Sequence, residues 1–246
     1  MEDIINIKEC QKRVVLITDC DTGFGIAMLE ILIKDGNIAI AFGKDEEIIN
    51  KTKKKLQNVL ENSVKGTFVL LKCDIINTQQ LEESFNYIQQ KYQGIDILIN
   101  NASCNIDCQV SSGSFEDFNQ IIDTNINALV ACTNFASKLM LNRKFTSHII
   151  NMNDIKAYEI PDEANKSIYL ATKASVTSIN EILRYEFRHT KANIKVTNVA
   201  CGGFDEDYSE DPTSKQQDLV AVVLGIINTS EHLHVHEILI EWESEY

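Results

Sequence analysis

Short apolar runs rich in Val, Ile and Leu alternate with longer amphipathic stretches along most of the chain. Apolar runs of this kind are typical of strands that are buried on both faces of a sheet. The amphipathic stretches are long enough to serve as crossover helices between parallel strands. The alternation predicts an α/β protein with a doubly wound parallel sheet of about seven strands, in three layers α/β/α. The expected strands are Arg13–Thr18, Ile38–Phe42, Thr67–Lys72, Ile95–Ile99, His148–Met152, Lys195–Val199 and one near Glu237–Glu241.

The helical stretches end at several glycines and are joined by short connections. No repeat, low-complexity segment or Pro/Gly/Ser-rich linker divides the 246 residues, which contain two prolines. A chain of this length can bury one sizeable core, so we expect a single domain over residues 1–246. The expected helices are Gly25–Lys34, Glu46–Val59, Thr78–Tyr92, Phe115–Asn142, Ser167–Thr190 and Leu219–Asn228.

The net charge, the N-terminal residues and the cysteines indicate which partners and which cell compartment we expect. The net charge of −13 opposes binding to nucleic acid or to anionic membranes. Residues 1–6 contain no basic leader, and no apolar run reaches the length of a membrane span. The seven cysteines are odd in number and lack paired zinc spacing. We therefore expect a cytoplasmic protein with reduced thiols, no nucleic-acid partner, no membrane partner and no metal.

Two smaller features leave alternatives open. His232, His234 and His236 would share one face of an extended segment, where they could bind zinc or copper, but alternating histidines also suit a subunit interface. Cys104 and Cys108 could be reactive thiols, although ordinary free thiols are commoner.

A glycine-containing turn follows the first expected strand, in the segment Thr18-Asp19-Cys20-Asp21-Thr22-Gly23-Phe24-Gly25. Ligands of open parallel sheets bind outside the carboxyl ends of the strands, and glycines there let a phosphate approach backbone N–H groups at a helix N-terminus. Two glycines alone are equally consistent with a tight turn that binds nothing.

The pair Tyr169-x-x-x-Lys173 lies far downstream, at the start of an expected helix. Four-residue spacing puts both side chains on one helix face. A lysine ammonium there would lower the tyrosine pKa from about 10 toward working pH, as an acid/base catalyst requires. Such pairs also occur in helices by chance, so the pair gains weight only from its context.

Taken together, the turn, Asn100-Asn101-Ala102 after the fourth strand, Asn125 and Tyr169-x-x-x-Lys173 resemble the short-chain dehydrogenase/reductase family in order and spacing. The resemblance covers nearly the whole chain and implies a Rossmann-type fold. The segment from Ile149 to Asp154, Pro161 and the histidine-rich ending look most like the animal subgroup called dehydrogenase/reductase member 11, including insect farnesol dehydrogenase-like proteins.

This resemblance implies hydride transfer between a nicotinamide cofactor and a small-molecule carbonyl or alcohol. It implies Tyr169 as proton donor or acceptor, Lys173 as the group that lowers its pKa and holds the nicotinamide ribose, and Asn125 as the holder of a water that links the lysine to solvent. Lys44, after the second strand, matches a basic position of NADP-preferring relatives, although it could be an ordinary surface lysine. The implied cofactor residues are Thr18, Gly23, Phe24, Gly25, Lys44, Asp74, Asn101, Ala102, Tyr169, Lys173 and Gly202. Homodimers or homotetramers through the helices 115–142 and 167–190 are implied as well.

Departures from the family pattern gather at the cofactor and catalytic positions. Asp19 replaces the first glycine of the turn, where a carboxylate near a pyrophosphate could cost a few kcal/mol at intermediate dielectric. Asp154 stands where the resembling proteins have a catalytic serine, and an ionised carboxylate can only accept hydrogen bonds. Asn153 is a conceivable substitute donor.

Further departures are Ser103 for a glycine, Cys201 for a proline, and Glu206 for a hydroxyl residue. Glu206 lies within an acidic stretch over residues 205–211.

Two hypotheses about function follow from these matches and departures. One is an NADP(H)-dependent carbonyl reductase or alcohol dehydrogenase that Asp19 and Asp154 impair, with Asp154 at the catalytic position. The other is a catalytically inactive binding or scaffold protein on the same fold.

Overall fold

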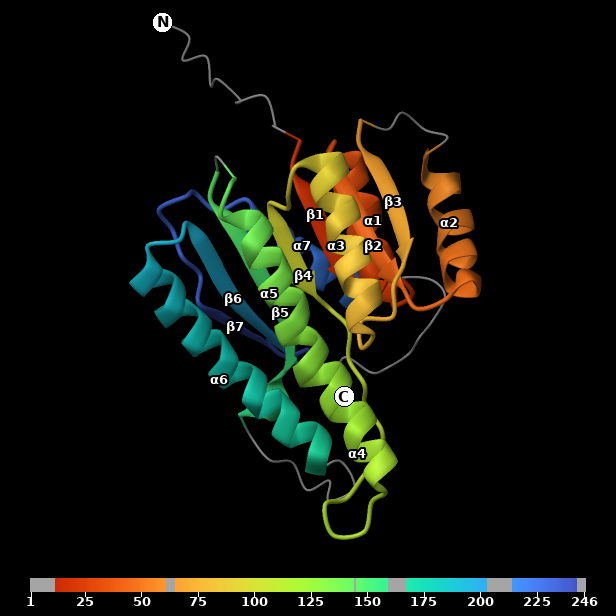
Figure 1. Ribbon diagram of the computed structural model, residues 1–246, viewed down its shortest axis with the longest axis vertical. Helices are drawn as coiled ribbons and strands as arrows, with labels where there is room; N and C mark the ends of the chain where they lie inside the picture. The colour runs from red at the N-terminus through yellow and green to blue at the C-terminus, as the bar shows by residue number, and fades with distance from the viewer. Residues whose placement is uncertain (1–11, 61–64, 144, 159–166, 203–213, 243–246) are drawn as a thin grey trace, which may run out of the picture.

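A computed structural model of the chain describes residues 12–60, 65–143, 145–158, 167–202 and 214–242. Its seven strands form one parallel sheet in the order β3-β2-β1-β4-β5-β6-β7 (Figure 1), which confirms the predicted doubly wound architecture. The strands are β1 (Val14–Thr18), β2 (Ile38–Gly43), β3 (Thr67–Lys72), β4 (Ile97–Asn100), β5 (Ser147–Asp154), β6 (Ile194–Cys201) and β7 (Glu237–Ile240).

Helices cover both faces of this sheet. In Figure 1, α3, α5 and α6 lie in front of the strands, while α1 and α7 lie behind them and pack against each other. The helices are α1 (Gly23–Lys34), α2 (Glu46–Leu60), α3 (Thr78–Tyr92), α4 (Phe115–Ile122), α5 (Leu129–Met140), α6 (Ser167–Thr190) and α7 (Ser214–Ile227), with a π-helix η1 (Asp123–Ala128) and a 3₁₀ turn η2 (Ile155–Ala157).

Each face of the sheet has its own hydrophobic core. Behind the sheet, Phe24 and Met28 of α1 pack with Leu219 and Val223 of α7. In front, residues of α3 and α5 pack on the strands, and the ring of Phe85 contacts other aromatic rings on both sides. Because these apolar side chains hold α1 and α7 together, the start of α7 lies beside the glycine turn that opens α1.

The strand order reverses between β1 and β4, so the carboxyl ends of these strands mark the expected ligand site. Parallel pairing puts Thr18 opposite Asn100, and Asn100 opposite Asn151. Hydrogen bonds between buried amide side chains hold the carboxyl ends of β4 and β5 in place. Asn100 donates to Asn151 at 2.7 Å, and Asn151 donates to Asn180 of α6 at 2.9 Å. The strand ends are thereby tied to the helix that carries Tyr169 and Lys173.

Several element boundaries differ from the sequence prediction. The expected helix Phe115–Asn142 is divided into α4, η1 and α5, because residues 123–128 adopt π-helical geometry. The last helix begins at Ser214 rather than Leu219, since its first turn is polar and carries no apolar periodicity. β5 extends to Asp154, which pairs with Cys201. No helix within the described ranges is both long enough and apolar enough to cross a membrane.

Candidate active site

The turn after β1 is held by side-chain hydrogen bonds to the loop after β4. The hydroxyl of Thr18 accepts from the backbone N–H groups of Asn101 at 2.9 Å and Ala102 at 3.1 Å. Thr22 is the N-cap of α1, and its hydroxyl accepts from the N–H of Gly25 at 3.0 Å and from the Asn101 side chain at 2.9 Å. Thr18, Gly25, Asn101 and Ala102, all expected at the cofactor, therefore lie together.

Asp19 adopts a left-handed conformation, with φ of 72°. This backbone region favours glycine and tolerates Asp or Asn. Burial raises the pKa of the Asp19 carboxyl well above its usual range, and the neighbouring Asp21 raises it further. A raised pKa favours the neutral acid, which repels a phosphate less than a carboxylate does. The strength with which Asp19 opposes a phosphate therefore depends on pH.

The N-terminus of α1 fits a pyrophosphate through its backbone. Within the described residues, no hydrogen bond involves the N–H of Gly23 or Phe24, which are the first two donors of the helix. The side chain of Phe24 is fully buried in the core. Phe24 can therefore face a ligand only through its backbone.

One side chain lies against this turn that the sequence did not single out. Gln216 of α7 is buried, and its amide atoms lie 2.1 to 2.5 Å from the position that a Cβ on Gly23 would take. The space left by the absent side chain of Gly23 is thus filled by an amide. Nothing in the sequence pattern indicates this contact, because Gln216 precedes the apolar part of α7.

Tyr169 and Lys173 lie in the first turns of α6 and are both buried, at 6% and 5% exposure. The Lys173 ammonium lies 5.4 Å from the centre of the Tyr169 ring, as the four-residue spacing predicted. The Tyr169 hydroxyl, however, donates a hydrogen bond of 2.7 Å to the Asp154 carboxylate at the end of β5. The structure therefore brings all three residues together, with the tyrosine proton directed to Asp154.

Asp154 uses both of its carboxylate oxygens. One accepts from Tyr169, and the other accepts from the N–H of Lys156 at 2.9 Å, which caps the η2 turn. The side chain at this position is therefore an acceptor in both contacts, whereas a substrate carbonyl would need a donor.

Asn125 lies in the π-helix η1 and acts as a clamp on the loop after β4. Its side chain accepts from the N–H of Cys104 at 2.7 Å, and it donates to the Cys104 carbonyl at 2.9 Å and to Thr172 at 3.0 Å. The side-chain amide of Asn125 is therefore bonded to protein groups, and a water held by Asn125 beside Lys173 stays a prediction. π-helical turns are rare and frequent at functional sites, and this one points Asn125 toward the helix of Tyr169.

Asn153 and Gly202, near the ends of β5 and β6, also form hydrogen bonds within the protein. Asn153, considered as a substitute donor, instead donates to the Lys173 carbonyl at 3.2 Å and to Thr177 at 3.1 Å. Burial raises the pKa of the Cys201 thiol to about 12. The N–H of Gly202 donates to the Ile240 carbonyl at 2.8 Å. Glu206, the stretch 205–211 and Pro161 lie outside the described residues.

The more distant cofactor positions lie at the other strand ends. Lys44 directly follows β2 and is exposed. Asp74 follows β3, where its N–H donates to the Gln80 side chain at 2.8 Å. Ser103, a departure from the family pattern, is exposed.

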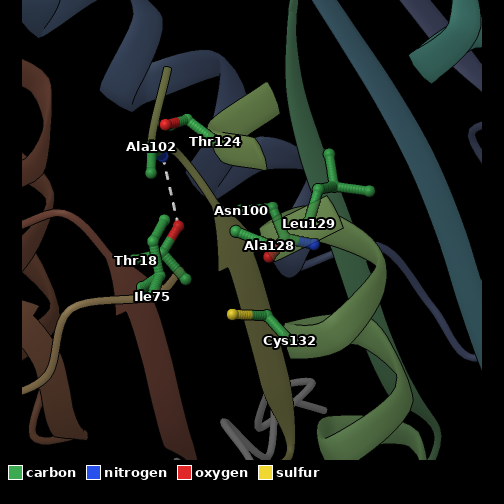
Figure 2. A pocket seen from close by; sticks show the side chains of 8 residues that line it. All are labelled: Thr18, Ile75, Asn100, Ala102, Thr124, Ala128, Leu129 and Cys132. Carbon is green, nitrogen blue, oxygen red and sulfur yellow. Dashed lines mark hydrogen bonds between the residues drawn. The ribbon is translucent and has the colours of Figure 1, made fainter. Parts of the chain in front are cut away.

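A small pocket opens beside Thr18 at the carboxyl ends of β1 and β4 (Figure 2). The space between its lining residues, about 170 Å³ and partly open to solvent, is too small to enclose a dinucleotide. It is lined by Thr18, Ile75, Asn100, Ala102, Thr124, Ala128, Leu129 and Cys132. Its position coincides with the switch point of the sheet.

The three alternating histidines lie on an exposed segment near the C-terminal end of the described residues. His232, His234 and His236 are all exposed and precede β7 rather than forming part of it. In the part of the chain that the structure describes, no group of three or more His, Cys, Asp or Glu side chains is arranged to hold a metal ion.

Comparison with known proteins gives matches along most of the chain. The family model for short chain dehydrogenase matches residues 13–217. Farnesol dehydrogenase of Aedes aegypti is 26% identical over 237 residues, which cover 93% of this chain and 95% of that protein. Dehydrogenase/reductase SDR family member 11 of Gallus gallus is 28% identical over 243 residues, which cover 92% of this chain and 94% of that protein.

Solved structures share the same architecture. The serine dehydrogenase from Escherichia coli superposes with a TM-score of 0.75 at 25% identity, covering 92% of this chain and 96% of that one. An alcohol dehydrogenase from Thermococcus sibiricus, complexed with 5-hydroxy-NADP, has a TM-score of 0.81 at 14% identity and covers 96% of this chain and 100% of that one. The second likeness concerns the fold alone.

Proposed function

The chain belongs to the short chain dehydrogenase family, and from this premise we propose that it is an NADP(H)-dependent oxidoreductase that reduces a small-molecule carbonyl or oxidises the corresponding alcohol. The observation that carries the proposal is the buried pair of Tyr169 and Lys173, with the ammonium 5.4 Å from the tyrosine ring. The pair lies on the helix that the buried amides tie to the carboxyl ends of β4 and β5.

The bound cofactor would supply or accept the hydride. Tyr169 would give its hydroxyl proton to the carbonyl oxygen, or take a proton from the alcohol, and Lys173 would favour the tyrosinate by its charge. Asn125 fixes the loop after β4 and the start of α6 through Cys104 and Thr172. We assign Asn125 as a positioning residue.

Cofactor binding is assigned to the turn between β1 and α1 and to the neighbouring strand ends. The N–H groups of Gly23 and Phe24 would face the pyrophosphate, and Thr22 and Asn101 hold this turn in shape. Exposed Lys44 would meet the 2′-phosphate that distinguishes NADP from NAD. Asp74 would face the adenine, Tyr169 and Lys173 the nicotinamide ribose, and Gly202 the nicotinamide side, as in the resembling family.

Asp154 is expected to make this enzyme slow. To donate to a substrate, the Tyr169 hydroxyl must leave its 2.7 Å bond to the carboxylate. The same bond is the specific observation that favours the second candidate, a catalytically inactive protein that uses the fold for binding or scaffolding. The enzyme proposal requires that the Tyr169 hydroxyl supports turnover, whereas the non-catalytic candidate does not.

The test is an assay of NADPH oxidation with a panel of small ketones and aldehydes. Turnover is measured as the decrease in NADPH absorbance. We expect slow turnover by the natural chain and none by Tyr169→Phe, which removes only the hydroxyl. Equal rates for the two proteins, or no NADPH binding at millimolar concentration, would contradict the proposed function and leave the non-catalytic candidate.

The cytosol is the compartment that we propose for this activity. All six cysteines among the described residues are free, which suits a reducing compartment. Recovery of the protein in a secreted or organellar fraction would contradict this assignment.

A further inference from the structure

The side chain of Gln216 fills a specific space at the turn that opens α1. If Gly23 carried a Cβ, the atoms nearest to it would all belong to the Gln216 amide, with Oε1 at 2.1 Å, Nε2 at 2.4 Å and Cδ at 2.5 Å. Gln216 is only 4% exposed, so this amide is enclosed rather than lying loosely on the surface. Gly23 therefore makes room for a protein side chain in this structure.

The same space has another use in dinucleotide-binding turns. A glycine at the start of the helix lets the pyrophosphate approach the backbone closely. Here the N–H groups of Gly23 and Phe24 have no hydrogen-bond partner within the described residues, and the α1 dipole favours an anion beside them. A pyrophosphate and the Gln216 amide thus compete for one surface of Gly23.

The backbone of Gln216 cannot easily move away. Leu219, Val220 and Val223 of α7 are buried in the core that includes Phe24 and Met28 of α1. The amide, by contrast, is the far end of a flexible side chain, so a change of its rotamer would clear Gly23 without movement of the helix. Access to Gly23 therefore depends on the rotamer of Gln216 rather than on movement of the helix.

We propose that Gln216 is a side-chain plug over Gly23 that sets the affinity of the dinucleotide by having to withdraw before the pyrophosphate can bind. This inference rests on the proposed function, because it concerns the same cofactor. Apparent affinity falls in proportion to the fraction of molecules in the binding-competent state. If withdrawn rotamers make up about 1–10% of the population, removal of the plug tightens binding about 10- to 100-fold.

The experiment is a calorimetric titration of NADPH into the natural chain, Gln216→Ala and Gln217→Ala. Gln217 is the matched control, since it is the same residue type, is adjacent on α7 and is exposed. We expect the Kd of NADPH to fall at least about tenfold in Gln216→Ala and to stay unchanged in Gln217→Ala. Gln216→Ser provides a second truncation, and thermal melts of each variant report folding.

The possible results separate the plug from the proposed function. NADPH binding of equal strength in the natural chain and both Gln216 truncations would overturn the plug and leave the proposed function standing. Weaker binding in the truncations would also overturn it, because Gln216 would then be a phosphate ligand. No binding in any folded variant would overturn the proposed cofactor and the plug together. Binding that appears only after truncation would support both.

Discussion

The chemistry of this site depends on the contacts that Tyr169, Asp154 and Gln216 make. The four-residue spacing correctly predicted that Tyr169 and Lys173 share one face of α6. The substitution at Asp154 indicated a lost donor, but only the structure shows that the Tyr169 hydroxyl bonds to this carboxylate. Gln216 could not be found from the sequence, because its contact with Gly23 depends on how α7 packs against α1. A contact between residues that are far apart in the chain produces no periodic sequence pattern from which it could be predicted.

Asp19 yields a prediction about pH and stability. Burial, assisted by Asp21, raises the pKa of Asp19 in the folded state above its unfolded value of about 3.9. The folded state then holds a proton that the unfolded state releases, so the stability that Asp19 contributes is present below about pH 4 and is lost as the pH rises toward the folded pKa. We expect Asp19→Asn, which tolerates the same left-handed φ, to be the more stable protein at neutral pH.

Urea unfolding of the natural chain and Asp19→Asn from about pH 4 to pH 8 measures this difference. The gap in free energy of unfolding should widen with pH, by at most about 1.4 kcal/mol per pH unit. Asp21→Asn keeps the Asp19 carboxyl but removes the neighbouring charge that helps to raise its pKa, so we expect a smaller gap from the natural chain for this variant. Parallel curves for the natural chain and Asp19→Asn would contradict the raised pKa.

At the scale of elements, apolar runs predicted the positions of the strands better than their ends. β5 and β6 continue to Asp154 and Cys201 because their backbone pairing persists beyond the apolar residues. The π-helix η1 was not predicted, since one altered turn of backbone hydrogen bonds hardly changes the apolar periodicity of a long helix. It places Asn125 where its side chain bonds to Cys104. The expectation that Asn125 holds a water stays a prediction.

For the whole molecule, the doubly wound fold and the family were both predicted from the sequence and are confirmed. Alternation of strand and helix patterns leaves few topologies, because parallel crossovers are right-handed and consecutive elements lie near each other. The expectation of a single domain over residues 1–246 stays a prediction. The Tyr169–Asp154 hydrogen bond and the position of the Gln216 amide beside Gly23 could not be predicted from the sequence, because they depend on individual rotamers.

We also propose that the whole chain associates as a homodimer or homotetramer through the helical segment formed by α4, η1 and α5 and through α6. Exposed apolar side chains on these helices support it, notably Ile182 at 54% and Tyr185 at 68% exposure. We expect light scattering to give a multiple of the 27.8 kDa chain mass. Tyr185→Glu should reduce the mass, whereas Ile76→Glu, in the loop after β3 and not on these helices, should not. A natural chain that is monomeric at all concentrations would contradict this proposal.

The central claim is that the remaining catalytic machinery is intact and is held back by the bond between Tyr169 and Asp154. The most direct measurement is kcat for NADPH-dependent carbonyl reduction by Asp154→Ser, compared with the natural chain and with the double variant Asp154→Ser/Tyr169→Phe. Serine can still cap the η2 turn, and it supplies the missing donor. We predict that kcat rises about 10²- to 10³-fold in Asp154→Ser and that the double variant shows no gain. A folded, NADPH-binding Asp154→Ser protein with unchanged kcat would contradict the account.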